Sequence, residues 1–375
     1  VYEGQMENFF KNNVFTIEEK TESPFMNKYG VYQDGTTPMY RDTDGRLWAM
    51  SGHTHMGHIG MFCGTCLDDL KEVYPIDTAF DVGRAGSAFC GVKYPEDILP
   101  RGSIWPFGLY ICPGTHRFFC FFHNESGWNG HGTGYVIDGK GDGEPDFRHI
   151  GLMHSDDEGR TWTFDRWVLT SEQVCFSEKY IPDHTVVKGQ KKGLTCLGCG
   201  DFSLFAEPDG EYIYLYYNLL KIDSETGLWQ SCDVYAARTR KRSDGVMGDF
   251  VKYYNGEFCE AGNLGKESPI VFNAWHPRVV YSKEHKIFVM SSTHTNCNVD
   301  SKNLVDGIME LRTSPDMLCW SEPRRVIYNG TYFGNHYTAI VSEDNSGQPY
   351  VVGDSFSILS GHNGTDVMRF KAKIG

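Results

Sequence analysis

The run Ser155–Trp162, with the sequence SDDEGRTW, constrains the fold more than any other segment of this 375-residue chain. Ser155, Asp157 and Gly159 have the spacing of a tight turn, because Ser and Asp side chains can cap backbone N–H groups and Gly accepts a positive φ angle. A large aromatic residue, Trp162, follows directly. The run therefore predicts a hairpin turn that leads into a strand packed through Trp162.

The same run resembles the Asp box, S-x-D-x-G-x-T-W, of sialidases and related β-propellers, and it matches that pattern at every fixed position. In the Asp box the Trp packs between neighbouring blades of the propeller. A partial second copy, Ser314-Pro315-Asp316 with Trp320, keeps the Ser, the Asp and the Trp. The resemblance implies a β-propeller, and it assigns the motif a structural role, not a catalytic one.

The composition agrees with an all-β fold. Aromatic residues make up 14% of the chain and Gly occurs 42 times, which favours many short strands joined by tight turns. A first strand, a turn and an aromatic-rich second strand recur five times, starting near residues 37, 105, 201, 276 and 336. The expected second strands are 47–50, 118–122, 212–217, 287–290 and 350–352.

We therefore predict a single β-propeller catalytic domain over residues 1–375. It has five blades, or six or seven if the longer intervals contain further blades. Residues 1 to about 36 are expected to supply a strand that closes the ring with the last blade, because closure removes exposed strand edges.

The third repeat, Asp201–Tyr217, resembles the inner-strand motif of five-bladed glycoside hydrolases of the arabinanase, xylosidase and fructosidase type. In those enzymes an Asp opens the strand, and a turn such as Asp209-Gly210 precedes a Tyr-rich strand. The resemblance implies a carbohydrate substrate and gives Asp201 a catalytic or pKa-tuning role. Glycoside hydrolysis needs two carboxyl groups, one on each side of the glycosidic bond.

Four carboxyl groups are candidates for this chemistry. Asp201 is either catalytic or a turn-capping residue after Gly198 and Gly200. Glu125, directly after an aromatic strand, is either the general acid or a solvated residue at a strand end. Asp34 is either the nucleophile or base of the first blade or an ordinary turn residue before Gly35. Glu267 is a further candidate acid on an expected loop.

The first residues of propeller inner strands line the mouth of the central tunnel. This places Asp201, His276 and His336 around one polar cavity, together with Trp105 and either Asp34 or Thr37, and it makes His276 a further catalytic candidate. Trp105 and Tyr337 would either stack on sugar rings or pack in the core. Arg278 would bind a carboxylate or sulfate group on a sugar, or form an ordinary salt bridge.

Histidines also follow the expected strand 47–50, at His53, His55 and His58. They would bind substrate or transfer protons, hold a metal ion, or belong to a polar loop. The pairs Cys63/Cys66 and Cys196/Cys199 have zinc-site spacing but lie far apart in the sequence, and the twelve cysteines are dispersed as expected of reduced thiols. No cofactor is expected to be required, although the central tunnel could hold a structural metal ion.

The charge balance limits the partners. A formal net charge of −14 and a pI near 5.4 do not provide the basic surface that nucleic acid or an anionic membrane requires. No stretch approaches the roughly 18 apolar residues of a membrane span. A carbohydrate is therefore the expected partner. The sequence leaves the oligomeric state open, and the location is secreted or periplasmic if the N-terminus is processed, and cytoplasmic otherwise.

Three functions fit these features. The first is a glycoside hydrolase that uses Asp201 and a second carboxyl group, with Glu125 favoured. The second is a polysaccharide lyase in which a His or Tyr removes the C5 proton of a uronic acid while Arg278 neutralises its carboxylate. The third is a propeller that binds glycans without turnover. A sialidase is disfavoured, because the arginine triad and Arg-Ile-Pro motif of that family are not found.

Overall fold

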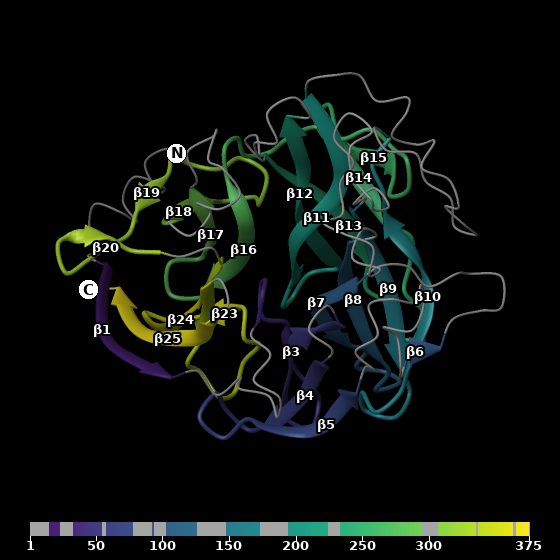
Figure 1. Cartoon of the computed structure of the whole chain (residues 1–375), viewed down its shortest axis with the longest axis horizontal. Coiled ribbons are helices and arrows are strands. Elements are labelled where there is room, and N and C mark those ends of the chain that lie inside the picture. Colours follow the sequence, from purple (N-terminus) through teal and green to yellow (C-terminus); the bar gives the residue numbers. More distant parts are fainter. Residues whose placement is uncertain are drawn as a thin grey trace.

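The computed structural model describes residues 15–22, 33–54, 58–77, 92–93, 103–125, 148–172, 194–223, 233–294, 307–334, 337–362 and 365–374. The elements in these ranges are all β-strands, and their sheets are arranged as the blades of a ring (Figure 1). The described residues contain no helix that is long and apolar enough to span a membrane. The predicted all-β fold is confirmed.

The first blade consists of β2 (Met39–Arg41), β3 (Leu47–His53), β4 (His58–Gly64) and β5 (Lys71–Asp77). The second blade consists of β7 (Ser103–Ile111), β8 (Phe118–Glu125), β9 (Arg148–Ser155) and β10 (Trp162–Leu169), with the short β6 (Val92–Lys93) parallel to β10. The third blade consists of β11 (Leu194–Ala206), β12 (Tyr212–Asp223), β13 (Val234–Arg240), β14 (Val251–Tyr254) and β15 (Glu257–Ala261). The second and third blades are joined by one parallel bridge between Gly198 and Arg148.

The fourth blade consists of β16 (Trp275–Ser282), β17 (Ile287–His294), β18 (Ile308–Ser314) and β19 (Arg324–Arg325). The fifth consists of β22 (Tyr337–Ser342), β24 (Ser355–His362), β25 (Thr365–Ile374) and β1 (Phe15–Glu22). A small hairpin, β20 (Ile327–Tyr328) with β21 (Thr331–Tyr332), follows the fourth blade. The described strands therefore form five blades, which is the number that the repeats predict.

The ring is closed by the N-terminal strand, as predicted. Strand β1 pairs antiparallel with β25, so the outermost strand of the last blade comes from the beginning of the chain (Figure 1). One predicted strand was wrong. Residues 350–352 were expected to form the second strand of the fifth blade, but β23 (Val351–Val352) pairs parallel with β16 of the fourth blade. The second strand of the fifth blade is β24, because its longer register with β22 covers six consecutive residue pairs.

The Ser155–Trp162 turn has the hydrogen bonds expected from its sequence. The Ser155 hydroxyl accepts the backbone N–H of Gly159 at 2.8 Å, and Asp157 accepts the backbone N–H of Thr161 at 2.8 Å. Gly159 has a φ of 86°, and the Trp162 side chain is fully buried. These bonds are local, which is why eight residues suffice to specify this turn.

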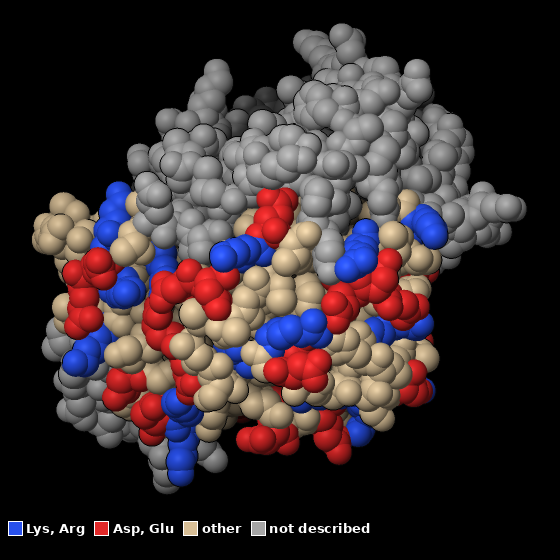
Figure 2. Space-filling model, turned by 90° about the horizontal axis from the view of Figure 1, so that it is seen from below, with Lys and Arg blue, Asp and Glu red and all other residues tan. Residues whose placement is uncertain are grey.

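The core follows the inner half of each blade. Every residue of β3 and β7 is buried, and so is every residue of β8 except Glu125. Neighbouring blades meet through aromatic pairs, for example Trp48 with Phe118, whose ring centroids are 5.0 Å apart. On the face shown in Figure 2, acidic and basic side chains are interspersed among uncharged ones. This face therefore has no single-sign patch of the kind that binds a polyanion.

Candidate active site

The starts of the inner strands meet at one end of the ring, and the contacts between their side chains cross from blade to blade. Tyr337 at the start of β22 donates a hydrogen bond through its hydroxyl to Asp201 Oδ1, with an O–O distance of 3.1 Å. His276 at the start of β16 places Nε2 3.8 Å from Asp201 Oδ2, and its ring lies 3.9 Å from the ring of Tyr337. Asp201 and His276 therefore lie close together, as expected, and Tyr337 contacts both of them.

The backbone at Asp201 and His276 departs from regular strand geometry. Each residue has a positive φ, 46° for Asp201 and 54° for His276, although neither is Gly. Each also lies in a register shift, the first between Gly200 and Ser203 and the second between Trp275 and Arg278. Bulges re-aim side chains, and strained backbone of this kind concentrates at functional sites. The irregular backbone therefore supports a functional role for both side chains.

Glu125 is held by two basic side chains at the end of β8. Its Oε1 lies 2.9 Å from His123 Nε2 and 3.2 Å from Nη2 of Arg148 on the adjacent strand β9. The backbone N–H of Asp201 donates to His123 Nδ1 at 3.2 Å, so Nδ1 is an acceptor and Nε2 carries the proton that bonds to Glu125. His123 thus connects two candidate acids, Glu125 and Asp201.

Small residues make room for this arrangement. A Cβ atom at Gly200 would lie 2.3 Å from Cε1 of His123, and one at Gly35 would lie 1.8 Å from Cε1 of Phe107. Phe107 in turn stacks on His123 with a centroid distance of 5.4 Å. Gly is therefore required at both positions, because any larger residue would displace the aromatic support beneath the carboxyl groups.

Asp34 has the most perturbed carboxyl group of the site. Its pKa is raised from 3.8 to about 7, mainly by burial and also by the charges of Glu125 and Asp201, whereas His123 and a hydrogen bond from Trp105 act in the opposite direction. Asp34 is half-buried by accessible area, so protein surrounds the carboxyl while some solvent contact remains. The interaction with Glu125 and Asp201 means that three carboxyl groups from three blades share one electrostatic environment.

Tyr337 is kept neutral by the same environment. Burial raises its pKa well above the usual range, and the charges of Asp201, Asp34 and Glu125 act in the same direction. The phenol therefore remains a hydrogen-bond donor to Asp201 across the neutral pH range.

The other predicted binding residues surround this cluster or lie outside the described residues. Trp105 is buried, stacks on His53 at 5.2 Å and contacts Asp34, so it supports a carboxyl group. His53 is also buried. His55, His336 and the side chain of His58 lie outside the described residues.

Arg278 and Glu267 are buried away from solvent. Arg278 is 2% exposed, its Nε and Nη2 atoms have no hydrogen-bond partner, and burial lowers its pKa to about 10. Glu267 forms a 2.7 Å ion pair with Lys252 and accepts a 2.6 Å hydrogen bond from the Tyr217 hydroxyl. Glu267 is therefore part of a buried structural ion pair.

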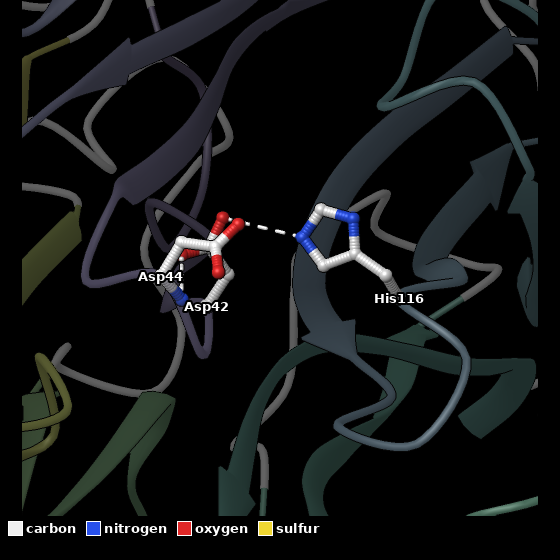
Figure 3. A group of neighbouring side chains, drawn as sticks. All are labelled: Asp42, Asp44 and His116. Atoms are coloured by element: carbon white, nitrogen blue, oxygen red, sulfur yellow. Dashed lines mark hydrogen bonds and ion pairs between the residues drawn. The ribbon is translucent and has the colours of Figure 1, made fainter.

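One grouping of the described residues has ligand atoms close enough together for a metal ion, and it lies at hairpin turns, not at the starts of the inner strands. Asp42 and Asp44 from the β2–β3 turn face His116 from the β7–β8 turn (Figure 3). Asp42 already accepts hydrogen bonds from Trp48, Arg46 and His116, and the Arg46 guanidinium supplies positive charge at 2.9 Å. These contacts connect two blades, so we interpret the cluster as a structural ion-pair network.

The two Cys-x-x-Cys pairs do not form a common site. Cys63 and Cys66 belong to the first blade, and Cys196 and Cys199 are buried in β11 of the third. All four are free thiols, as are the other described cysteines, Cys112, Cys120, Cys259 and Cys319. The expectation of reduced thiols is therefore met within the described part of the chain.

Sequence reasoning missed two residues of the site, His123 and Arg148. His123 precedes Glu125 by two residues on one strand, so the period of two already placed both side chains on one face. Arg148 offered no comparable signal, because its pairing with Glu125 depends on the β8–β9 register.

Known proteins of solved structure resemble this chain in fold. Neither a protein-family model nor a curated protein sequence matches the chain. Among solved structures, an exo-β-1,3-galactanase from Phanerochaete chrysosporium is similar with a TM-score of 0.50 and 8% identity over 94% of this chain and 64% of that one. An α-L-arabinofuranosidase from Lactobacillus brevis gives a TM-score of 0.48 and 12% identity, with 93% and 92% covered. A family 117 glycoside hydrolase from Zobellia galactanivorans gives 0.48 and 11%, with 96% and 90% covered. At these identities the similarity concerns the fold alone.

Proposed function

We propose that this protein is a glycoside hydrolase that cleaves a glycosidic bond in an oligo- or polysaccharide at the mouth of its central tunnel. The observation that carries the proposal is the convergence of Asp34, Glu125 and Asp201 from three blades, with the pKa of one of them raised to about 7. An acid and a base in one site need different pKa values, and carboxyl groups in different environments provide them. The solved structures of similar fold include enzymes that act on galactan and arabinan, which supports a carbohydrate substrate.

The geometry supports a distinct role for each acid. Asp34 holds a proton near neutral pH and is the general acid that protonates the glycosidic oxygen. Asp201, oriented by Tyr337 and 3.8 Å from His276 Nε2, is the opposing carboxylate that acts as base or nucleophile. Glu125, bound by Arg148 and His123, keeps its negative charge and helps to hold the proton on Asp34. This assignment moves the general-acid role from Glu125, which the sequence favoured, to Asp34.

The test of this function is activity on a panel of glycans that contains arabinan, β-1,3-galactan, xylan and polygalacturonate. Reducing ends and ultraviolet absorbance are read together, for the wild type and for Asp201→Asn. New reducing ends without absorbance, lost in the variant, are the expected result. Absorbance from unsaturated products, retained in the variant, would instead identify a lyase. Binding of a glycan without new reducing ends and without absorbance would identify a glycan-binding protein that has no turnover.

The pH profile tests the role of Glu125. In the wild type, kcat/KM should fall as the pH rises through the pKa of Asp34, near 7, because the general acid loses its proton. Burial would still raise that pKa in Glu125→Gln, but the largest charge contribution would be gone. The alkaline limb should therefore move to lower pH by about one unit.

The matched control is Asp165→Asn, which removes a carboxyl group of the same blade that pairs with His154 at 2.6 Å. It should leave the profile unchanged. An alkaline limb that stays in place in Glu125→Gln would contradict the role given to Glu125.

A further inference from the structure

A cavity of about 380 Å³ lies in the seam between the third and fourth blades, apart from the cluster of carboxyl groups. Its walls come from the segment before β16, which contains Phe272 and Asn273, from β17, β18 and β19, and from the segment between β18 and β19, which contains Trp320. The volume lies within the range of pockets that bind small ligands. None of the residues that line it was a candidate in the sequence.

One lining residue, His294, lies at the end of the fourth blade that carries His276. His294 ends β17, and the preceding Thr293 pairs with Trp275 at the start of β16. Phe272 precedes His276 by only four residues. The His294 side of the cavity is therefore turned toward the blade end at which His276 lies.

The groups of its polar wall are paired with one another. Glu310 is buried, and its carboxylate lies 3.5 Å from Nδ1 of His294, 3.4 Å from Nε of Arg325 and 3.1 Å from Nη2 of Arg312. These mutual contacts fix the planar groups in place before a ligand binds. Pre-organised groups of this kind lose little side-chain freedom when they bind hydroxyl groups.

Its apolar wall is partly exposed. The Phe272 side chain is 65% exposed, the highest exposure among the large hydrophobic residues of the described structure. Trp320 lines the same cavity, and its indole N–H is already bound to the carbonyl of Met317 at 3.0 Å. Both side chains can therefore contribute apolar ring surface, and an exposed ring is the contact that the apolar face of a sugar requires.

The charges of the wall cancel. The guanidinium groups of Arg312 and Arg325 are matched by the carboxylates of Glu310 and Glu322. A strongly anionic or cationic ligand would therefore gain little from this wall. Fixed polar groups, aromatic surface and zero net formal charge together match a neutral, hydroxyl-rich ligand.

We propose that this cavity is a second binding site for a neutral sugar unit of a polymeric glycan, and that it holds the chain at a distance from the cleaved bond. The substrate-holding role rests on the proposed hydrolase function, whereas the binding itself does not. Phe272 supplies the stacking surface, and the group around Glu310 supplies hydrogen bonds to hydroxyl groups.

The test compares wild type, Phe272→Ala and Phe272→Tyr by electrophoresis in non-denaturing gels that contain arabinan, β-1,3-galactan or xylan. Phe272→Ala should weaken retention by about five- to tenfold, as is usual for truncation of a central aromatic contact, and Phe272→Tyr should retain it. Val246→Ala is the matched control, because Val246 is an exposed apolar residue (53%) in the loop between β13 and β14 and does not line the cavity.

Hydrolysis separates the two proposals. KM for the retained polymer should rise by about five- to tenfold in Phe272→Ala, while kcat/KM for the disaccharide of the same linkage stays at the wild-type value. If retention depends on Phe272 but the protein has no hydrolytic activity, the proposed binding site is supported and the proposed hydrolase function is wrong. Hydrolysis with unchanged retention and unchanged KM in Phe272→Ala would overturn the site alone.

Discussion

Replacing Asp34 with Asn is expected to abolish hydrolysis and, at pH 7, to make the protein more stable. The loss of the general acid should lower kcat by about 10²- to 10⁴-fold, the range typical of a positioned acid. The gain in stability follows from the pKa of Asp34, which burial and the charges of Glu125 and Asp201 raise from 3.8 to about 7. Forcing this group to ionise in the folded state costs free energy that a neutral amide does not.

The sign of this effect depends on pH. Below about pH 4, Asp34 is protonated in both the folded and the unfolded state, so Asp34→Asn should change the stability little. Between about pH 4 and 7 the unfolded chain loses the proton more readily than the folded protein, so the wild type is progressively destabilised. The raised pKa of Asp34 sets an upper limit of about 4 kcal/mol on the gain in the free energy of unfolding. Because Asp34 keeps some contact with solvent, we expect a gain of about 1–3 kcal/mol.

Urea unfolding of wild type and Asp34→Asn at pH 4 and pH 7.5 measures this difference. Asp165→Asn serves again as the control, since its carboxyl group pairs with His154 in the second blade, where both side chains are partly buried. A variant that is inactive and more stable only at the higher pH supports the assignment. If wild type and Asp34→Asn were equally stable at both pH values, the pKa of Asp34 would not be raised in the folded protein.

Replacing Lys252 with Met is expected to destabilise the protein by about 3–5 kcal/mol, the cost of breaking a buried ion pair on one side. Lys252 is completely buried and Glu267 is 2% exposed at the side chain, with 2.7 Å between Nζ and Oε2. The ammonium group also donates to the carbonyls of Thr170 and Gly265 at 2.8 and 3.0 Å. Without Lys252, the Glu267 carboxylate would remain buried without its cation.

The double variant Lys252→Met/Glu267→Gln should recover a large part of this loss, because the uncompensated charge is then removed. The exposed pair Arg240 and Glu211 provides the control, and Glu211→Gln should change the free energy of unfolding by no more than about 0.5 kcal/mol. Thermal or urea unfolding of wild type, Lys252→Met, Glu267→Gln and the double variant completes the cycle, and Glu211→Gln is measured beside them. A cost below about 1 kcal/mol for Lys252→Met would show that Glu267 is neutral in the fold.

Local patterns in the sequence were sufficient for the architecture. The turn at Ser155–Trp162 depends on hydrogen bonds within eight residues, and the repeats near 37, 105, 201, 276 and 336 each became the inner part of one blade. The error at 350–352 has a simple cause. Those residues have the apolar character of a strand, but the sequence does not contain the information that their partner is β16.

The candidate site was predictable in part. Asp201 and His276 could be placed together because the starts of inner strands converge in a propeller, and the structure shows their contact and adds Tyr337 to it. The positive φ angles of Asp201 and His276 could not be predicted from the sequence, because non-Gly residues adopt them uncommonly, although Asp and His do so more often than most. Their catalytic roles stay predictions until the variants are measured.

The sequence by itself determined the all-β class, the five repeats and the turn between β9 and β10, because each depends on alternation and hydrogen bonding between near neighbours. Only the tertiary structure decided which acid holds a proton. The raised pKa of Asp34 is the sum of its burial and the fields of Glu125 and Asp201, which come from other blades. The same reason makes Arg148 a partner of Glu125 and Lys252 a partner of Glu267: desolvation and Coulomb interactions depend on distance in space, and folding alone sets that distance.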